Sequence, residues 1–187
     1  MPVVRRQDGR GIGYADERGF DRDGYGVLWS RAPSQPGKGR PRFGQVHSLR
    51  QRIAMSGVRC QICGGPADRT RDGVLWLVDA RPDHLRPRDE KTAHPPVCRP
   101  CAHRSVTACP HLRRAVTALR VRHFAPVGVN GILHRPAGRA APEPVDVGWF
   151  AYDDPRIPWV RAHQLVVRLT GFAPVHLTTP EPRSPET

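Results

Sequence analysis

The chain has 187 residues and a formal net charge of +13; 38% of the residues are hydrophobic, and 21 are proline and 18 glycine. This composition predicts a modest hydrophobic core with long irregular connections, held by some additional cross-link. No apolar run approaches the ~20 residues of a membrane-spanning helix. The N-terminus also lacks the apolar core of a signal peptide. We therefore expect a cytoplasmic protein with no membrane partner.

The N-terminal part of the chain is expected to be irregular. Residues 1–45 carry recurrent glycines, and 31–41 read as a basic linker rich in proline and glycine. Residues 46–55 are predicted to form a short helix, because apolar side chains recur there at helical spacing. The apolar side would hold Leu49, Ile53 and Ala54, and the solvent side Arg50 and Arg52.

Two Cys-x-x-Cys pairs, separated by 34 residues, are the most specific motif in the chain: Cys60 with Cys63, and Cys98 with Cys101. Four thiolates satisfy a tetrahedral Zn²⁺, and the two-residue spacing lets a tight turn place both sulfurs of a pair on one ion. Because such a site leaves no position for water, we expect one structural zinc that stabilises the fold without catalysing a reaction. Residues 46–134 are then predicted to form a zinc-finger core.

Alternative interpretations of the cysteines are less favoured. A redox dithiol normally uses a single Cys-x-x-Cys on a thioredoxin-like unit, and that pattern is absent. The fifth cysteine, Cys109, lies close to His111 and offers an alternative ligand. Since four better-spaced sulfurs exist, we expect Cys109 to be a buried free thiol.

Regular elements are predicted around and after the second cysteine pair. The apolar run over 74–79 is the best strand candidate, and a helix following the second pair is expected to end near Pro110. Residues 115–134 contain several valines and an Asn130-Gly131 dipeptide, which favour a β-hairpin with its turn at that dipeptide.

The C-terminal part is predicted to contain a linker, a helix and a tail. Residues 135–148 are rich in proline, glycine and alanine, and are interpreted as a linker. The region 149–177 is expected to hold an amphipathic helix with its N-cap at Asp154 and its stop at Gly171. Its apolar stripe would be Ile157, Val160, Leu165, Val166 and Leu169. Residues 178–187 are expected to be disordered.

The positive charge is concentrated in two blocks. Residues 24–67 contain seven basic residues and no acid, and 91–142 contain nine basic residues and no acid. Each block carries one cysteine pair, so binding of one metal would bring the blocks together into a surface suited to a polyanion. The candidate phosphate contacts are Arg40, Arg42, Arg50, Arg52, Arg59, Arg99, Arg104, Arg113 and Arg114.

Residues 58–112 resemble the treble-clef zinc fingers, and within them the HNH endonuclease group. The matching positions are Cys60, Cys63, Gly64, Cys98 and Cys101, with Val78-Asp79 in place of the group's Val-Asp. The resemblance implies a small, irregular α+β fold in which a knuckle, a β-hairpin and a helix enclose a four-cysteine zinc site. The rest of the chain looks like small proteins of actinobacteria and their phages. This second resemblance does not point to any particular function.

The chain departs from the nuclease pattern at the residues that carry activity. Ala80 stands where the group has its general-base histidine, and Ala102 where a histidine follows the last cysteine. Hydrolysis then lacks a base to activate water and a ligand for a catalytic metal. His84 and His103 are weak candidates to substitute, and we interpret them as solvated or structural histidines.

Three functions follow from these observations, and the first is preferred. It is a zinc-stabilised nucleic-acid-binding protein that contacts the phosphate backbone, with DNA as the expected partner and no catalytic residue. The second is a divergent HNH-type, metal-dependent endonuclease. The third is a structural or protein-interaction zinc module of phage or mobile-element origin, whose basic face binds an acidic protein.

Overall fold

The computed structural model describes residues 2–33, 46–86, 90–109, 112, 116–138 and 140–177. In these ranges the chain is a small mixed α/β protein whose elements are, in order, β1 (Val4–Arg5), β2 (Ile12–Gly13), η1 (Gly19–Asp21), β3 (Leu28–Trp29), α1 (Ser48–Ser56), β4 (Arg69–Thr70), β5 (Gly73–Val78), η2 (Pro82–His84), β6 (Glu90–Thr92), α2 (Arg99–Ala108), β7 (Thr117–Ala137), β8 (Ala140–Ala151), η3 (Ile157–Trp159) and β9 (Val160–Pro174).

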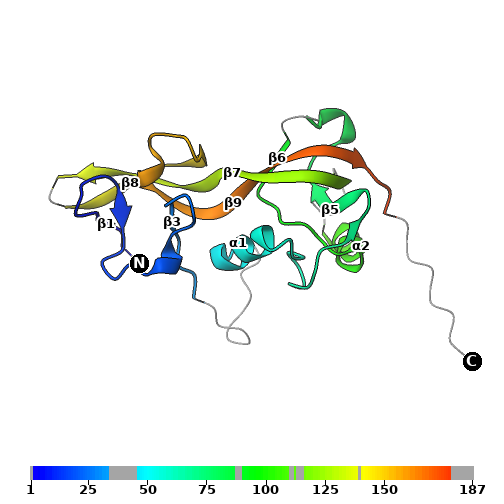
Figure 1. Cartoon of the computed structure of the whole chain (residues 1–187), viewed down its shortest axis with the longest axis horizontal. Coiled ribbons are helices and arrows are strands. Elements are labelled where there is room, and N and C mark those ends of the chain that lie inside the picture. The colour runs from blue at the N-terminus through cyan, green and yellow to red at the C-terminus, as the bar shows by residue number, and fades with distance from the viewer. Residues whose placement is uncertain are drawn as a thin grey trace, which may run out of the picture.

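A long antiparallel ribbon of β7 and β9 forms the centre of the molecule (Figure 1). The edge of β7 opposite β9 pairs with two strands. β5 pairs with the first part of β7 and β8 with the second part, both antiparallel. The other edge of β9 is also shared, by β6 in antiparallel and by β3 in parallel orientation. Strands from the whole length of the chain therefore meet in one sheet.

The prediction of a hairpin turn at Asn130-Gly131 is wrong, because β7 runs straight through both residues. Gly131 is needed for a different reason: a Cβ there would lie 2.6 Å from the Val160 side chain of the neighbouring strand.

The prediction of a linker over 135–148 is wrong as well, since the described residues of that segment belong to β7, β8 and the turn between them. Gly138 occupies this turn with a positive φ of 60°.

The predicted C-terminal amphipathic helix is also wrong, because the chain forms β9 there. Leu165, Val167 and Leu169, at alternate positions, belong to one hydrophobic cluster, which is the period of a strand, and Val166 between them is also buried. Hydrogen bonding to β7 along most of its length satisfies the backbone of β9. Asp154 starts a turn that leads into η3. The Ile157 amide donates to the backbone carbonyl of Asp154 at 2.9 Å.

The two helices and strand β5 lie where the sequence predicts them, but α1 is rotated. Its exposed face holds Leu49 and Ile53, which are 41% and 50% exposed. Its buried face holds Ser48, Gln51, Ala54 and Met55. Arg50 is exposed as expected, whereas Arg52 is half-buried. The apolar residues of α1 therefore do not all face the core, and a glutamine takes one of the buried positions.

The two larger hydrophobic clusters lie on opposite faces of β5. Val74, Trp76 and Val78 contribute to the larger cluster, which also contains residues of β3, β7, β8 and β9. Leu75 and Leu77 contribute to a smaller cluster that contains Cys60 and the first turns of α2. This alternation is expected for a strand buried on both sides, and it places the cysteines against the sheet.

The N-terminal region is more ordered than predicted over its described part, residues 2–33. Val3, Ile12, Tyr14 and Leu28 form a small buried cluster. Strands β1 and β2 form a separate two-stranded sheet, and the cluster links it to the main sheet through Ile12 of β2 and Leu28 of β3. Residues 34–45, which include most of the linker expected over 31–41, and the expected disordered tail 178–187 lie outside the described residues. Within the described part of the chain, no helix is long and apolar enough to cross a bilayer.

Candidate metal centre

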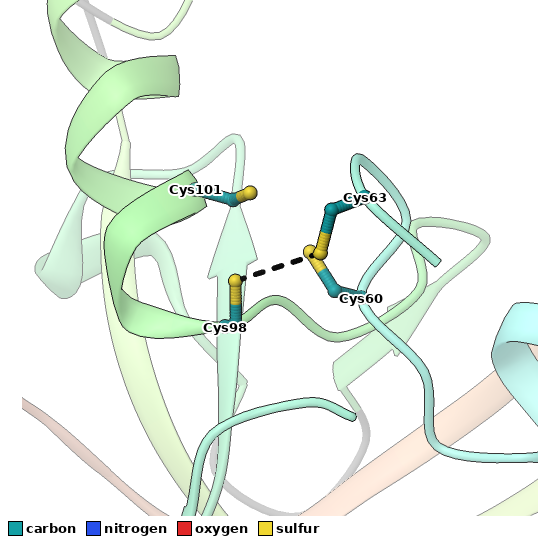
Figure 2. A group of neighbouring side chains, drawn as sticks. All are labelled: Cys60, Cys63, Cys98 and Cys101. Carbon is teal, nitrogen blue, oxygen red and sulfur yellow. Dashed lines mark hydrogen bonds between the residues drawn. The ribbon is translucent and has the colours of Figure 1, made fainter. Parts of the chain in front are cut away.

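Figure 2 shows the four cysteines of the two Cys-x-x-Cys pairs facing one another. Cys60 and Cys63 come from the loop after α1, and Cys98 and Cys101 from the start of α2. All four sulfurs lie within 4.8 Å of one another. Cys63 Sγ and Cys98 Sγ are 3.8 Å apart, which matches the edge of about 3.8 Å of a tetrahedron with metal–sulfur bonds near 2.3 Å. The donor set and spacing are those of a metal site, as the sequence predicts.

The loop between Cys60 and Gly65 is a tight knuckle closed by backbone hydrogen bonds. The Cys60 amide donates to Gly65 O, and the Gly64 amide donates to Cys60 O, both at 2.8 Å. Gly64 has a positive φ of 74°, a conformation that costs little for a residue without Cβ. The turn thereby brings two sulfurs together from positions only three residues apart.

The second pair is positioned by the N-terminus of α2. Cys98 is the N-cap residue and Cys101 lies in the first turn, with the Ala102 amide donating to Cys98 O at 2.9 Å. Pro100 occupies the first turn, where its missing N–H would have no helical partner. Burial raises the pKa of both the Cys98 and the Cys101 thiol, and the positive end of the helix dipole at these sulfurs acts in the opposite direction.

The ionisation of the four thiols is uneven. Burial alone would raise the pKa of Cys60, but hydrogen bonds from the backbone amides of Cys63, Cys98 and Ile62 outweigh it and lower the pKa to about 7. Burial and hydrogen bonds to the other thiols raise the pKa of Cys101 to about 12. Because burial raises the pKa of Cys98 and Cys101, a cation among the sulfurs would favour the form with four thiolates.

Apolar side chains enclose the inner side of the cysteine cluster. Cys60 and Cys101 are buried and pack with Leu75, Leu77 and Val97. The other two sulfurs lie nearer the surface, since Cys63 is exposed and Cys98 half-buried. The site therefore has a dry inner wall and an open outer side.

Two of the predicted phosphate-contacting arginines bind the knuckle itself. Arg50 Nη2 donates to Ile62 O at 2.6 Å, and Arg59 Nη1 donates to Gly64 O at 3.3 Å. Arg99 follows Cys98 and lies 3.8 Å from the Asp68 carboxylate. Arg50 and Arg59 are thereby held on the loop that carries the first cysteine pair.

The other predicted arginines are not gathered at the cysteines. Arg104 is exposed on α2. Arg52 points to a different part of the molecule, where its Nη2 donates to Phe20 O at 2.9 Å and its guanidinium lies 4.9 Å from the Trp29 ring centre. Arg40, Arg42, Arg113 and Arg114 lie outside the described residues.

A residue that sequence reasoning missed is Asp68, which joins the cysteine cluster to the sheet. Its carboxylate forms an ion pair with Arg120, whose side chain is only 5% exposed. Arg120 Nη1 also donates to the carbonyls of Asp68 and Gly73, at 3.3 and 3.2 Å. The pairing depends on the register of β5 and β7, so no local pattern of residues indicates it.

His84 and His103, the weak candidates for catalysis, lie on η2 and α2. His84 is highly exposed and lies 3.6 Å from the Asp83 carboxylate, while His103 is half-buried. Among the described residues, neither histidine belongs to a group of three or more potential ligands close enough to share an ion. Cys109 is likewise outside the four-cysteine cluster, and it is half-buried rather than buried.

Comparison of the chain with protein-family models, curated proteins and solved structures finds no significant match.

Proposed function

We propose that Cys60, Cys63, Cys98 and Cys101 hold one structural Zn²⁺ and that the protein binds nucleic acid, with DNA as the preferred partner. Zinc accounts best for four sulfur donors in a tetrahedral spacing with no position left for a substrate. The ion would supply the positive charge that lets all four sulfurs ionise. It would also join two parts of the chain whose core is thin.

The order of elements around the cysteines supports the treble-clef assignment. The knuckle is followed by the hairpin of β4 and β5, and the second cysteine pair opens α2. In a treble clef the ligands come from a knuckle and from the first turn of a helix, as they do here. The assignment concerns the metal-binding unit alone, since the long β7–β9 ribbon is additional.

One observation carries the nucleic-acid proposal: the cysteine cluster joins the two acid-free blocks of the chain. Arg50 and Arg59 from the first block, and Arg99 and Arg104 from the second, therefore belong to one part of the molecule. Phosphate groups bind such arginines through charge and bidentate hydrogen bonds. With no helix identified as entering a groove, contact with the phosphate backbone is the mode that the arrangement favours.

Binding of a labelled duplex and a labelled single strand, measured by anisotropy at two salt concentrations, tests this function. Affinity should fall steeply with salt, and Arg104→Gln should reduce the slope for duplex DNA by about one unit. Arg81→Gln is the matched control, because Arg81 is exposed and lies outside both acid-free blocks. Absence of binding at low salt would reject the proposal and favour an acidic protein as the partner of the basic surface.

A nuclease remains the alternative, and it has its own test. Nothing in the described part of the chain favours it over binding, because His84 and His103 share no ligand cluster. Purified protein should leave supercoiled DNA intact with Mg²⁺ or Mn²⁺. Cleavage that His84→Ala or His103→Ala abolishes would establish the nuclease instead.

A further inference from the structure

A pocket of about 160 Å³ lies between α1 and the N-terminal region, away from the cysteine cluster. Its lining residues come from η1, β3, α1 and the segments next to them, and they include Arg18, Phe20, Trp29, Arg31, Leu49 and Arg52. Figure 1 shows the segments that contribute these residues, the blue N-terminal part of the chain and the cyan helix α1. The proposed phosphate-binding surface does not account for this pocket.

The walls of the pocket are apolar and aromatic. Trp29 is buried at 3% exposure and forms the inner wall, while Phe20 at the outside is 58% exposed. Leu49 adds an exposed aliphatic side chain from α1. An exposed phenylalanine ring beside a hollow has no role in the core of this protein, and it offers a face on which a flat ring can stack.

The charges around the pocket are positive on balance. Arg31 is engaged by two carboxylates, those of Asp16 at 2.9 Å and Asp21 at 2.6 Å. Asp21 is therefore neutralised and does not repel an anion. Arg52 and Arg18 face no carboxylate within salt-bridge distance among the described residues. Their guanidinium groups lie over the rings of Trp29 and Phe20, at 4.9 and 5.9 Å.

We propose that this pocket binds one nucleotide unit, with the base against Phe20 and Leu49 and the phosphate on Arg18 and Arg52. A nucleotide combines the two features that the pocket demands, a flat ring and an adjacent anion. The inference rests on the proposed function when the unit belongs to a nucleic-acid strand, and stands apart from it when the unit is a free nucleotide. Bases in a duplex are stacked and cannot enter, so the pocket selects single strands.

The test compares binding of a single-stranded oligonucleotide with binding of a duplex of the same length. Phe20→Leu removes the ring and keeps an apolar side chain, and it should weaken single-strand binding about tenfold while duplex binding stays unchanged. Tyr25→Leu is the matched control, because Tyr25 is also 58% exposed but does not line the pocket. Arg18→Gln should weaken single-strand binding as well, and exposed Arg10→Gln should not. Equal thermal midpoints would show that all four variants fold.

Adenosine monophosphate distinguishes the two sources of the nucleotide. Saturation-transfer NMR should detect its base protons on the wild-type protein and lose the signal with Phe20→Leu. If wild type binds both strands and the pocket variants match their controls, the pocket inference is overturned while the proposed function stands. If wild type binds neither strand, the proposed function fails, and loss or retention of the adenosine monophosphate signal in Phe20→Leu decides the pocket separately.

Discussion

Gln51 and Leu165 are joined by a pair of hydrogen bonds in which a side-chain amide imitates a neighbouring strand. Leu165 N donates to Gln51 Oε1 at 2.8 Å, and Gln51 Nε2 donates to Leu165 O at 2.9 Å. The same Nε2 donates to Ala93 O at 2.7 Å. On this edge of β9, β3 pairs up to Ala162 and β6 begins at Val167. Gln51 thus fills the gap between two short strands and fixes α1 on the sheet.

Gln51→Leu should lower the free energy of unfolding by about 2–4 kcal/mol, because it leaves the buried N–H and C=O of Leu165 and the partly buried carbonyl of Ala93 without this partner. Gln164→Leu is the matched control; its half-buried amide accepts one bond from Asn130 at 3.3 Å, and its loss should cost under about 1 kcal/mol. Urea midpoints at constant m-value measure both changes. Equal effects of the two substitutions would contradict the structural role of Gln51.

Metal content should depend on Cys101 and not on Cys109. Purified protein should hold one zinc per chain, and Cys101→Ser should lose it together with cooperative unfolding, because the serine oxygen is a poor zinc ligand. Cys109→Ser should keep both, since Cys109 is outside the cluster. Elemental analysis and thermal melts with and without a chelator provide the measurement. A chain that is metal-free yet melts as cooperatively as the loaded one would reject the site.

Two glycines of the β7–β8 hairpin should respond differently to alanine. A Cβ on Gly128 would collide with the Phe150 carbonyl oxygen, so Gly128→Ala must push the strands apart and should cost about 1–3 kcal/mol. A Cβ on Gly148 would meet nothing within 4 Å, and Gly148→Ala should change stability by less than about 0.5 kcal/mol. Denaturant unfolding compares them directly, and a neutral Gly128→Ala would show that the strands are less close than described.

The buried ion pair of Asp68 and Arg120 should be far more sensitive to substitution than the exposed pair of Glu143 and Arg135. Asp68→Asn leaves the nearly buried guanidinium without its counter-charge and should cost about 3 kcal/mol or more. Glu143→Gln breaks a 3.3 Å pair at the surface and should cost under about 1 kcal/mol. The comparison, made by urea unfolding, also tests the register of β5 and β7, on which the buried pair depends.

Stability should fall as the pH is lowered through the range of histidine titration. Burial lowers the pKa of His134, and the Arg161 cation lowers it further. Burial and the same cation also lower the pKa of His163. Below about pH 6.5 the unfolded chain therefore binds protons at these histidines more readily than the folded chain does. The contribution of the two neutral histidines to the free energy of unfolding is present above that pH and is lost as the pH falls below it.

Urea midpoints measured between pH 7 and pH 5, with zinc in excess, show the size of this effect. His134→Gln should flatten the dependence, whatever it does to stability at pH 7. Any loss of metal at low pH affects both proteins, so the difference between their slopes reports the histidine. Parallel slopes would contradict the pKa shift at His134.

The sequence predicts the metal site because its information is local. The two-residue spacing of a Cys-x-x-Cys pair is enough to predict that both sulfurs can reach one ion. The strand over 74–79 and the two helices can likewise be predicted from residues that are neighbours in the chain. In α1, however, the buried face is decided by the bond from Gln51 to a strand more than a hundred residues away. The apolar spacing of Leu49 and Ile53 therefore gives the wrong face.

The long ribbon could not be predicted for the same physical reason. Residues 157–169 satisfy a helical spacing of apolar side chains, yet Val160, Val166 and Val167 are β-branched and pair with β7 instead. Asn130-Gly131 has the composition of a tight turn, but the missing Cβ of Gly131 serves the approach of Val160. Both misassignments come from partners distant in the chain, which a single sequence does not reveal.

Strand β7 pairs with β5 on the side of the cysteines and with β8 and β9 from the C-terminal part of the chain. This arrangement limits which fragments of the protein can be studied alone. A fragment ending at residue 134 would keep all four cysteines but lose β9, whose Leu165, Val167 and Leu169 pack in the same cluster as Trp76. Such a fragment would keep the small cluster around Cys60, Leu75 and Leu77, but the opposite face of β5 would lose the residues that cover it. Experiments on the cysteines and on the pocket at Phe20 have to be made by point substitution in the whole chain, because neither part is a separable module.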